Sequence, residues 1–196
     1  MEKTLDHIRR LFPEAEQISD PELRQKVYRA WLTVWELSGC ESPDTVTFLP
    51  GILPEIDNVA HTRAVVAMSV QFANVMKSFH NVQVNMDYII AGALLHDLGK
   101  YFRSSPNSAK VGELLGHAFS AAYIAIKEDL PVEVVHIISA HSNEGDLIKR
   151  STEAAIVHYM DQAYAEVILR AKTNINREEF HKLRIFKQAL RDEAKK

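Results

Sequence analysis

Hydrophobic residues recur three or four positions apart along most of the chain, the spacing that gives a helix one apolar face. Residues 22–38 are a clear example, and their stripe consists of Leu23, Val27, Trp31, Val34 and Leu37. We interpret this stripe as core or as a dimer contact. No convincing pair of alternating strands, internal repeat or low-complexity tract accompanies the helical pattern. The pattern therefore predicts an all-α fold.

Proline and glycine cluster in two segments, which predicts the main loops. The first segment is Gly39–Pro54 and the second is Ser104–Gly116. Asp57 is a suitable N-cap for the helix that follows the first loop, and that helix should run to about His80. The chain of 196 residues suits one compact domain.

Composition narrows the classes of protein further. The hydrophobic content of 46% and the charged content of 25% are ordinary for a soluble globular domain. The formal charge of −3 makes a long nucleic acid an unlikely partner, since bulk positive charge is missing. A single cysteine, Cys40, rules out an internal disulfide framework, and no signal peptide or membrane-spanning stretch stands out. We therefore expect a cytoplasmic protein without a membrane partner.

Candidate chemistry appears where histidines and aspartates fall on the apolar stripes. His61 begins the stripe that continues through Val65, Met68, Phe72, Val75 and Phe79. His96 and Asp97 follow the apolar run Ile89, Ile90, Ala93 and Leu94, and His141 ends the stripe Val134, Ile137 and Ile138. Asp161 lies in the helix predicted over 152–171, on the stripe that also carries His158.

Inward-facing carboxylates indicate a bound cation. An isolated ionised carboxylate in an apolar interior costs several kcal/mol unless it is paired or coordinated. One buried histidine alone is more often a hydrogen-bonded core residue than a ligand. The combined set is hard to explain as coincidence, and it consists of His61, His96, Asp97, His117, His141 and Asp161. His7, His80 and His181 are expected at the surface, and His136 points away from the stripe of His141.

The string Leu94-Leu95-His96-Asp97-Leu98-Gly99-Lys100 resembles the HD superfamily of metal-dependent phosphohydrolases. That family is defined by the order His, His-Asp, Asp, which His61, His96-Asp97 and Asp161 match here. The resemblance covers roughly Asp57 to Ala171. It implies an HD-domain helical bundle with a core of about 57–171 and leaves the terminal helices unassigned. The helical pattern adds an N-terminal helical extension at 1–56 and a C-terminal helix at about 177–194, and we expect residues 1–196 to form a single HD domain.

The resemblance also implies how many metals are bound. Members with two metals carry extra histidines between the HD pair and the last aspartate, and His117 and His141 occupy those places. One divalent ion would then be held by His61, His96, Asp97 and Asp161, and a second by His117 and His141 with Asp97 bridging. Iron, manganese or cobalt are favoured, with zinc, nickel and magnesium as alternatives, and the near-absence of cysteine disfavours structural zinc.

Two known subgroups of the superfamily help to narrow the substrate. The stretch 152–161 looks like the HD domain of a bacterial 3′-to-5′ exoribonuclease, but the OB-fold domain that precedes it there has no counterpart here. The Gly-Tyr-Pro signature of cyclic-di-GMP phosphodiesterases is also missing. We therefore expect a small phosphorylated substrate, such as a nucleotide. The sequence leaves the oligomeric state open.

The mechanism implied by the resemblance is hydrolysis of a phosphate ester by a metal-bridging hydroxide. Asp97, Lys100 and His158 are the candidate catalytic residues. Lys100 is either a phosphate-binding point charge or a solvated residue at a helix end, as is Arg103, and His158 either orients a ligand or water or is a core histidine. A di-iron oxygenase that uses O₂ and a non-catalytic sensing or scaffold domain are the alternatives.

Overall fold

A computed structural model describes residues 3–104, 109–176, 178–180 and 182. The C-terminal helix predicted at about 177–194 and the side chain of Arg103 lie outside the residues so described, as does His181. None of the helices in the described part is long and apolar enough to cross a membrane.

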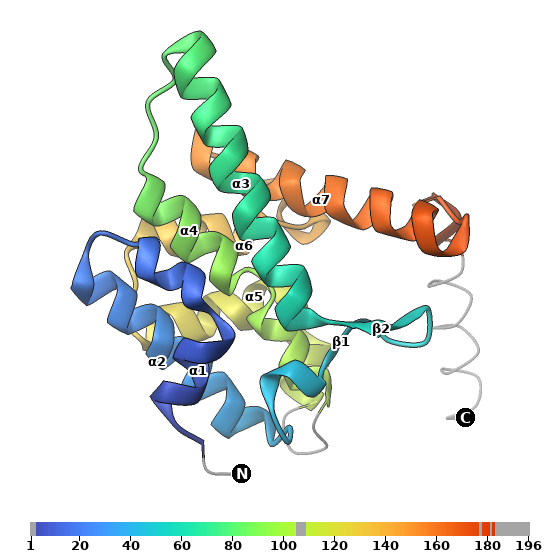
Figure 1. Ribbon diagram of the computed structural model, residues 1–196. Coiled ribbons are helices and arrows are strands. Elements are labelled where there is room, and N and C mark those ends of the chain that lie inside the picture. Colours follow the sequence, from blue (N-terminus) through green and yellow to red (C-terminus); the bar gives the residue numbers. More distant parts are fainter. Residues whose placement is uncertain (1–2, 105–108, 177, 181, 183–196) are drawn as a thin grey trace.

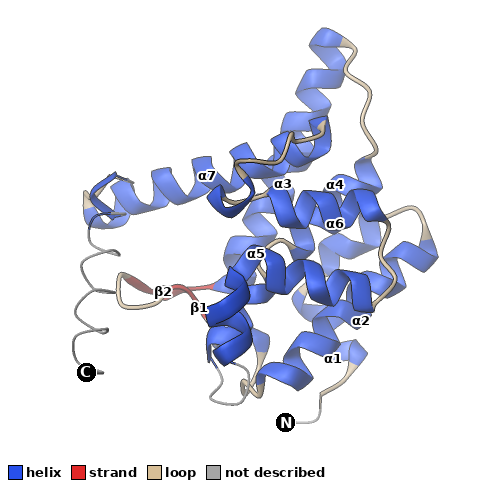
Figure 2. Cartoon of the chain, turned by 180° about the vertical axis from the view of Figure 1, so that it is seen from behind, coloured by secondary structure: helices blue, strands red, loops and turns tan. Residues whose placement is uncertain are grey.

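The described chain is almost entirely helical, which confirms the all-α prediction (Figures 1 and 2). The α-helices are α1 (Leu5–Leu11), α2 (Pro21–Ser38), α3 (Asn58–His80), α4 (Met86–Leu95), α5 (Ala109–Lys127), α6 (Val132–Ala140) and α7 (Thr152–Thr173). Short 3-10 turns connect them, and these are η1 (Pro13–Gln17), η2 (Pro43–Thr45), η3 (Leu98–Ser104) and η4 (Asn143–Gly145).

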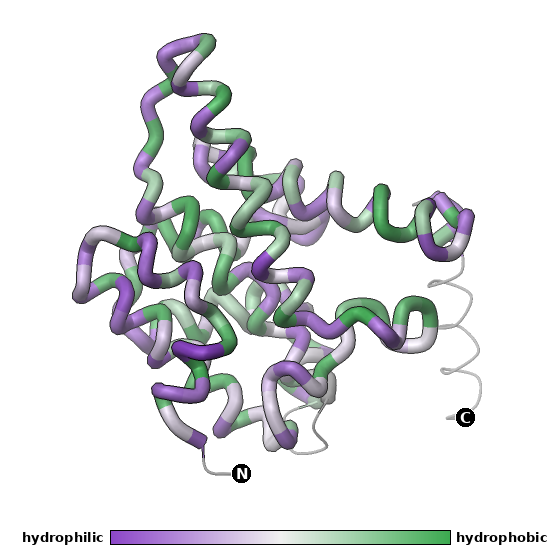
Figure 3. The backbone as a smooth tube through the Cα atoms, viewed as in Figure 1, coloured by the Kyte–Doolittle hydropathy of each residue, from purple (hydrophilic) through white to green (hydrophobic). Residues whose placement is uncertain are grey.

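Helix α4 is the centre of the bundle, and every residue from Ile89 to Leu95 is buried. It contacts α2, α3, α6 and α7, and it forms a hydrophobic segment in the middle of the tube in Figure 3. The N-terminal helices pack onto this centre. The Trp31 indole of α2 donates a hydrogen bond of 3.1 Å to the carbonyl oxygen of Leu94, and it stacks on Phe12 at 4.1 Å.

Helix α3 begins where its predicted cap stands. The Asp57 carboxylate accepts a hydrogen bond of 2.7 Å from the amide of Ala60, and the helix ends at His80 before Asn81 turns left-handed. The stripe predicted for this helix is only half correct. Val65 is buried, but Phe72, Val75 and Phe79 are 39%, 49% and 79% exposed. The reason is that the second half of α3 extends beyond the bundle (Figure 1), so a helical period there has no core to face.

The expectation of no paired strands is wrong in one place. The predicted loop Gly39–Pro54 leads into a short antiparallel hairpin, formed by β1 (Thr47–Leu49) and β2 (Leu53–Asp57). Strands of three and five residues are too short to display a clear alternation in sequence. The second predicted loop, Ser104–Gly116, is also shorter than expected, because α5 already begins at Ala109.

Candidate metal centre

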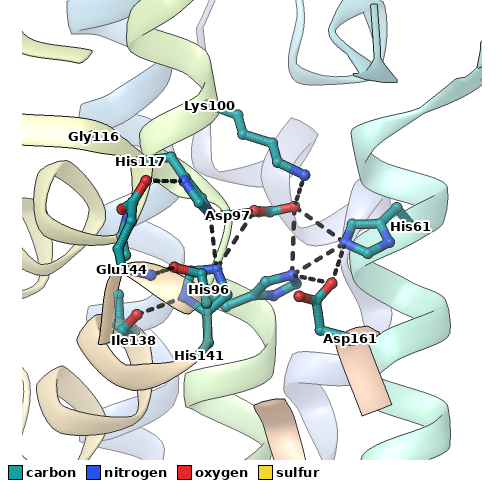
Figure 4. A network of polar contacts seen from close by, with 12 residues as sticks. His61, His96, Asp97, Lys100, Gly116, His117, Ile138, His141, Glu144 and Asp161 are labelled. Carbon is teal, nitrogen blue, oxygen red and sulfur yellow. Dashed lines mark hydrogen bonds and ion pairs between the residues drawn. The ribbon is translucent and has the colours of Figure 1, made fainter. Parts of the chain in front are cut away.

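The first group of ligand atoms comes from three helices that are far apart in sequence. His61 lies on α3, His96 follows the last residue of α4, and Asp161 lies on α7. The Nε2 atom of His61 is 3.2 Å from Nε2 of His96 and 3.3 Å from Oδ1 of Asp161 (Figure 4). His96 Nε2 is 3.8 Å from the same Asp161 oxygen. Ligands that share one cation lie about 3 to 4 Å apart, so this spacing fits a bound ion.

The second group consists of Asp97, His117 and His141. The two Nε2 atoms of His117 and His141 are 3.2 Å apart. They lie 3.9 Å and 3.8 Å, respectively, from Oδ1 of Asp97. Two imidazoles and a carboxylate at this spacing fit a second cation.

Asp97 joins the two groups because each of its oxygens faces a different one. Its Oδ2 atom is 3.1 Å from Nε2 of His61 and 3.4 Å from Nε2 of His96, whereas Oδ1 faces His117 and His141. Figure 4 shows the carboxylate between the two sets of imidazoles. The six residues predicted as ligands are thus brought together, in the division that the sequence resemblance implied.

The protonation of the imidazoles suits metal binding. Nδ1 of His96 lies 2.7 Å from the carbonyl oxygen of Ala93, and Nδ1 of His141 lies 2.6 Å from that of Ile138. A carbonyl only accepts, so each Nδ1 carries a proton and each Nε2 is the nitrogen that faces the centre. In the metal-free protein burial alone would lower the pKa of His96, but the Asp97 charge outweighs burial and raises this pKa, so binding of a cation there would release a proton. Both histidines are the C-caps of their helices, where free carbonyls remain to accept such bonds.

His61 is oriented by aromatic rings instead. Its Nδ1 is buried without a hydrogen-bond partner among the described residues. Its ring stacks on Phe48 of the β1–β2 hairpin at 3.9 Å, with an angle of 24° between the planes, and Tyr164 of α7 lies at 4.7 Å on a tilt. The hairpin that the sequence did not reveal therefore helps to fix the first histidine of the motif.

The charges of the buried groups support one another. Burial alone would raise the pKa of Asp97, but the Lys100 ammonium and His96 hold it well below its usual range. Hydrogen bonding to His61 and the charge of His96 likewise outweigh burial and lower the pKa of Asp161. Burial lowers the pKa of His141 to about 3, with further lowering by His96 and His117. Two ionised carboxylates and a neutral His141 are the forms that bind a cation.

Comparison with known proteins agrees with this geometry. The HD domain family matches residues 58–166, more than half of the chain. The chain belongs to the HD domain family. A dihydroneopterin 2′,3′-cyclic phosphate phosphodiesterase from Methanocaldococcus jannaschii is 33% identical over 173 residues, which cover 81% of this chain and 69% of that protein. No solved structure gives a significant match.

Family membership and the donor set make this HD protein a metal-dependent phosphohydrolase, and the predicted enzyme class is confirmed. Divalent metal binding follows from the same two observations. The number and identity of the ions, the domain boundaries and the roles of single residues stay predictions.

Lys100 lies at the edge of the centre. Its Nζ atom is 2.6 Å from Oδ2 of Asp97 and 4.3 Å from the centroid of the Phe48 ring. The side chain is one-fifth exposed. Lys100 therefore points inward from η3, which favours the interpretation as a site residue over that of a solvated helix end.

His158 lies behind the centre. Its Nδ1 atom is 2.6 Å from the carbonyl oxygen of His141 and donates a hydrogen bond to it. This bond holds the segment that follows α6 against α7. It is not a member of either ligand group. Among the other histidines, His80 is exposed at the end of α3 as expected, and His136 accepts a hydrogen bond from the amide of Ser151. His7, expected at the surface, is instead half-buried, because its ring packs against Trp35 and contacts Ser42.

Glu144 is a further functional candidate, and the sequence alone fits it equally well as a residue facing the pocket or as a plain polar loop residue. Its Oε1 atom is 2.9 Å from Nδ1 of His117, and its Oε2 atom accepts a hydrogen bond of 2.9 Å from the amide of Ala118. A carboxylate on the outer nitrogen of a ligand histidine is a recurrent arrangement at metal sites. The only signal in the sequence is an acidic residue three positions after His141, which does not by itself reveal its partner.

Proposed function

We propose that this HD protein is a phosphodiesterase that uses two divalent cations to open a cyclic phosphate ester of a small nucleoside-like molecule. The observation that carries the proposal is the division of the Asp97 carboxylate between two histidine groups. The named activity of the relative from Methanocaldococcus jannaschii, on a 2′,3′-cyclic phosphate, supports this substrate class.

Each ion would have its own residues. His61, His96 and Asp161 would hold the first cation, His117 and His141 the second, and Asp97 would contribute one oxygen to each. Imidazole and carboxylate ligands together favour iron, manganese or cobalt. When bound, such a pair of cations activates water for attack on phosphorus and neutralises charge on the phosphoryl oxygens.

The substrate would approach from the side where the ligand residues are partly exposed. His117 and Asp161 are 16% and 13% exposed, whereas His61 and His96 are fully buried. Lys100 is also one-fifth exposed and reaches Asp97, and its ammonium would bind an oxygen of the phosphate as a point charge. In the reaction, the water oxygen bonds to phosphorus, one ring P–O bond breaks, and the leaving oxygen takes a proton from the water.

His158 would act through its hydrogen bond to the backbone of His141. By holding this carbonyl it would keep the His141 ring aimed at the second cation. We assign it a positioning role, and we keep the catalytic role for Asp97 and Lys100. The expected cellular setting is the cytoplasm, where the lone thiol of Cys40 would stay reduced.

The test is hydrolysis of nucleoside 2′,3′-cyclic monophosphates by protein loaded with iron(II), manganese(II) or cobalt(II), with O₂ excluded. We expect the cyclic diester to yield a monoester that accumulates. Asp97→Asn should abolish turnover and metal uptake. Asp87→Asn is the matched control, because the Asp87 carboxylate accepts hydrogen bonds from Ser19 and Asp20 and lies outside both ligand groups.

Each alternative predicts a different result. Release of inorganic phosphate from monoesters, with no attack on the cyclic diester, would make the protein a phosphomonoesterase. Turnover that requires O₂ would identify a di-iron oxygenase. Full metal content without turnover of any phosphate ester would favour the non-catalytic scaffold. Each of these results would overturn the proposal.

A further inference from the structure

The Glu144 carboxylate reaches one short stretch of α5 with both of its oxygens. One carboxylate oxygen lies 2.9 Å from Nδ1 of His117, and the other accepts a hydrogen bond of 2.9 Å from the amide of Ala118 (Figure 4). Glu144 itself belongs to η4, just after His141. Glu144 therefore connects the segment that follows His141 to the ring of His117, although it is not itself one of the ligand residues.

Gly116 makes the approach of this carboxylate possible. Its backbone, with φ of 68° and ψ of 177°, interrupts α5 in a conformation that is almost restricted to glycine. A Cβ atom at this position would lie 2.9 Å from three atoms of the Glu144 carboxyl group. The helix resumes after this break, so the amide of Ala118 lies in a new first helical turn. Amides in that turn have no carbonyl partner within the helix and favour an anion, here the Glu144 carboxylate.

His117 depends on this contact more than the other ligand histidines depend on theirs. His96 and His141 are held by carbonyl oxygens of their own helices, and His61 is enclosed by Phe48 and Tyr164. His117 is 16% exposed, and its Nδ1 atom lies 2.9 Å from the carboxylate of Glu144, which belongs to a different segment. Without the carboxylate, its ring would gain freedom to rotate away from Asp97.

We propose that Glu144 is a positioning residue on which the second cation site depends. The first site should then fill before the second site and should still bind its cation when Glu144 is replaced. This inference rests on the proposed two-cation function. The first site has two carboxylates and fully buried imidazoles, whereas the second has only the Asp97 carboxylate and includes His117, which is 16% exposed. The carboxylate keeps the proton on Nδ1, so that Nε2 stays a ligand, and it makes that nitrogen more basic.

The test is titration of metal-free protein with cobalt(II) or manganese(II), followed by metal analysis. In Glu144→Gln we expect the second equivalent to bind about 10- to 100-fold more weakly, with the first equivalent unchanged. Glu144→Asp should recover part of the loss if it reaches His117. Glu113→Gln is the matched control, because Glu113 is an exposed carboxylate on α5, four residues before His117. This variant should bind both ions as the wild type does.

A spectroscopic measurement separates positioning from a loss of folding. Electron paramagnetic resonance of the manganese-loaded wild type should show a coupled pair, and Glu144→Gln at the same loading should show an isolated ion. Thermal unfolding of the metal-free variant checks that it is folded. A Glu144→Gln protein that binds two ions with wild-type affinity would overturn the inference while leaving the proposed function intact. A wild type that never binds more than one ion would overturn both.

Discussion

Gly99 lies between the His96-Asp97 pair and Lys100, and it faces the backbone of His117. A Cβ atom added to Gly99 would lie only 1.8 Å from the carbonyl oxygen of His117. Ordinary contact begins at 3.4 Å, so Gly99→Ala forces η3 and α5 apart by about 1.6 Å. A Cβ atom is fixed by the backbone that carries it, and the atom it meets is a backbone oxygen. A change of side-chain rotamer therefore cannot relieve this contact.

Such a shift exceeds what a metal site tolerates, because ligand distances are reproduced to within about 0.2 Å. We expect Gly99→Ala to lose the second cation and phosphodiesterase activity. Overpacking costs about 1 to 3 kcal/mol, and each kcal/mol lowers the melting temperature of a domain of this size by about 2 to 4 °C. The expected fall in the metal-free protein is therefore about 2 to 12 °C.

Calorimetry of the metal-free protein and metal analysis of the loaded protein measure the two effects. Glu113→Ala is the matched control, because Glu113 is exposed in the helical part of α5 before the break at Gly116. Alanine is a good helix former, so this substitution should leave the melting temperature and the metal content close to those of the wild type. Wild-type melting temperature and metal content in Gly99→Ala would refute the argument that this contact sets the position of His117.

Three further predictions concern the centre. Asp97→Ala should take up neither ion and show no turnover, and an active metal-free variant would contradict the shared-carboxylate site. Phe48→Ala removes the ring stacked on His61, so binding of the first ion should weaken by about 10-fold or more, measured by competition with a chelating dye; Phe48→Tyr should bind almost as the wild type does. In the metal-free protein His141 has a pKa of about 3 and stays neutral, while the unfolded chain takes up its proton below about pH 6.5. The free energy of unfolding should therefore fall by on the order of 1.4 kcal/mol per pH unit from pH 6.5 towards pH 3 on account of His141, and urea unfolding of His141→Asn should lack this part of the slope.

Most of the ligand residues could be predicted because they lie on or directly after the apolar stripe of a helix, whereas the role of His117 came from the family resemblance. His61, Asp97 and Asp161 stand next to apolar residues with helical spacing, so the sequence alone indicates that they face inward. The same argument failed in the second half of α3. Phe72 and Phe79 follow the correct period, but a period gives only the face of a helix and does not say where the bundle ends.

The supporting residues could not be predicted in this way. Phe48 lies in a segment rich in proline and glycine, and its place over His61 depends on a hairpin of very short strands. Glu144 reaches His117 across 27 residues, through a backbone break at Gly116 that only the folded chain displays. Contacts of this kind depend on tertiary geometry and leave no periodic trace in the sequence.

The hydrogen bond from Trp31 to Leu94 has a consequence for how the protein can be divided. It joins α2 to the last turn of α4, immediately before His96. A fragment limited to the family match at 58–166 would leave that carbonyl without its donor and would expose the face of α4 that α2 covers. We therefore expect the smallest unit that folds to be larger than the segment by which the family is recognised, with the N-terminal helices as part of the scaffold of the enzyme.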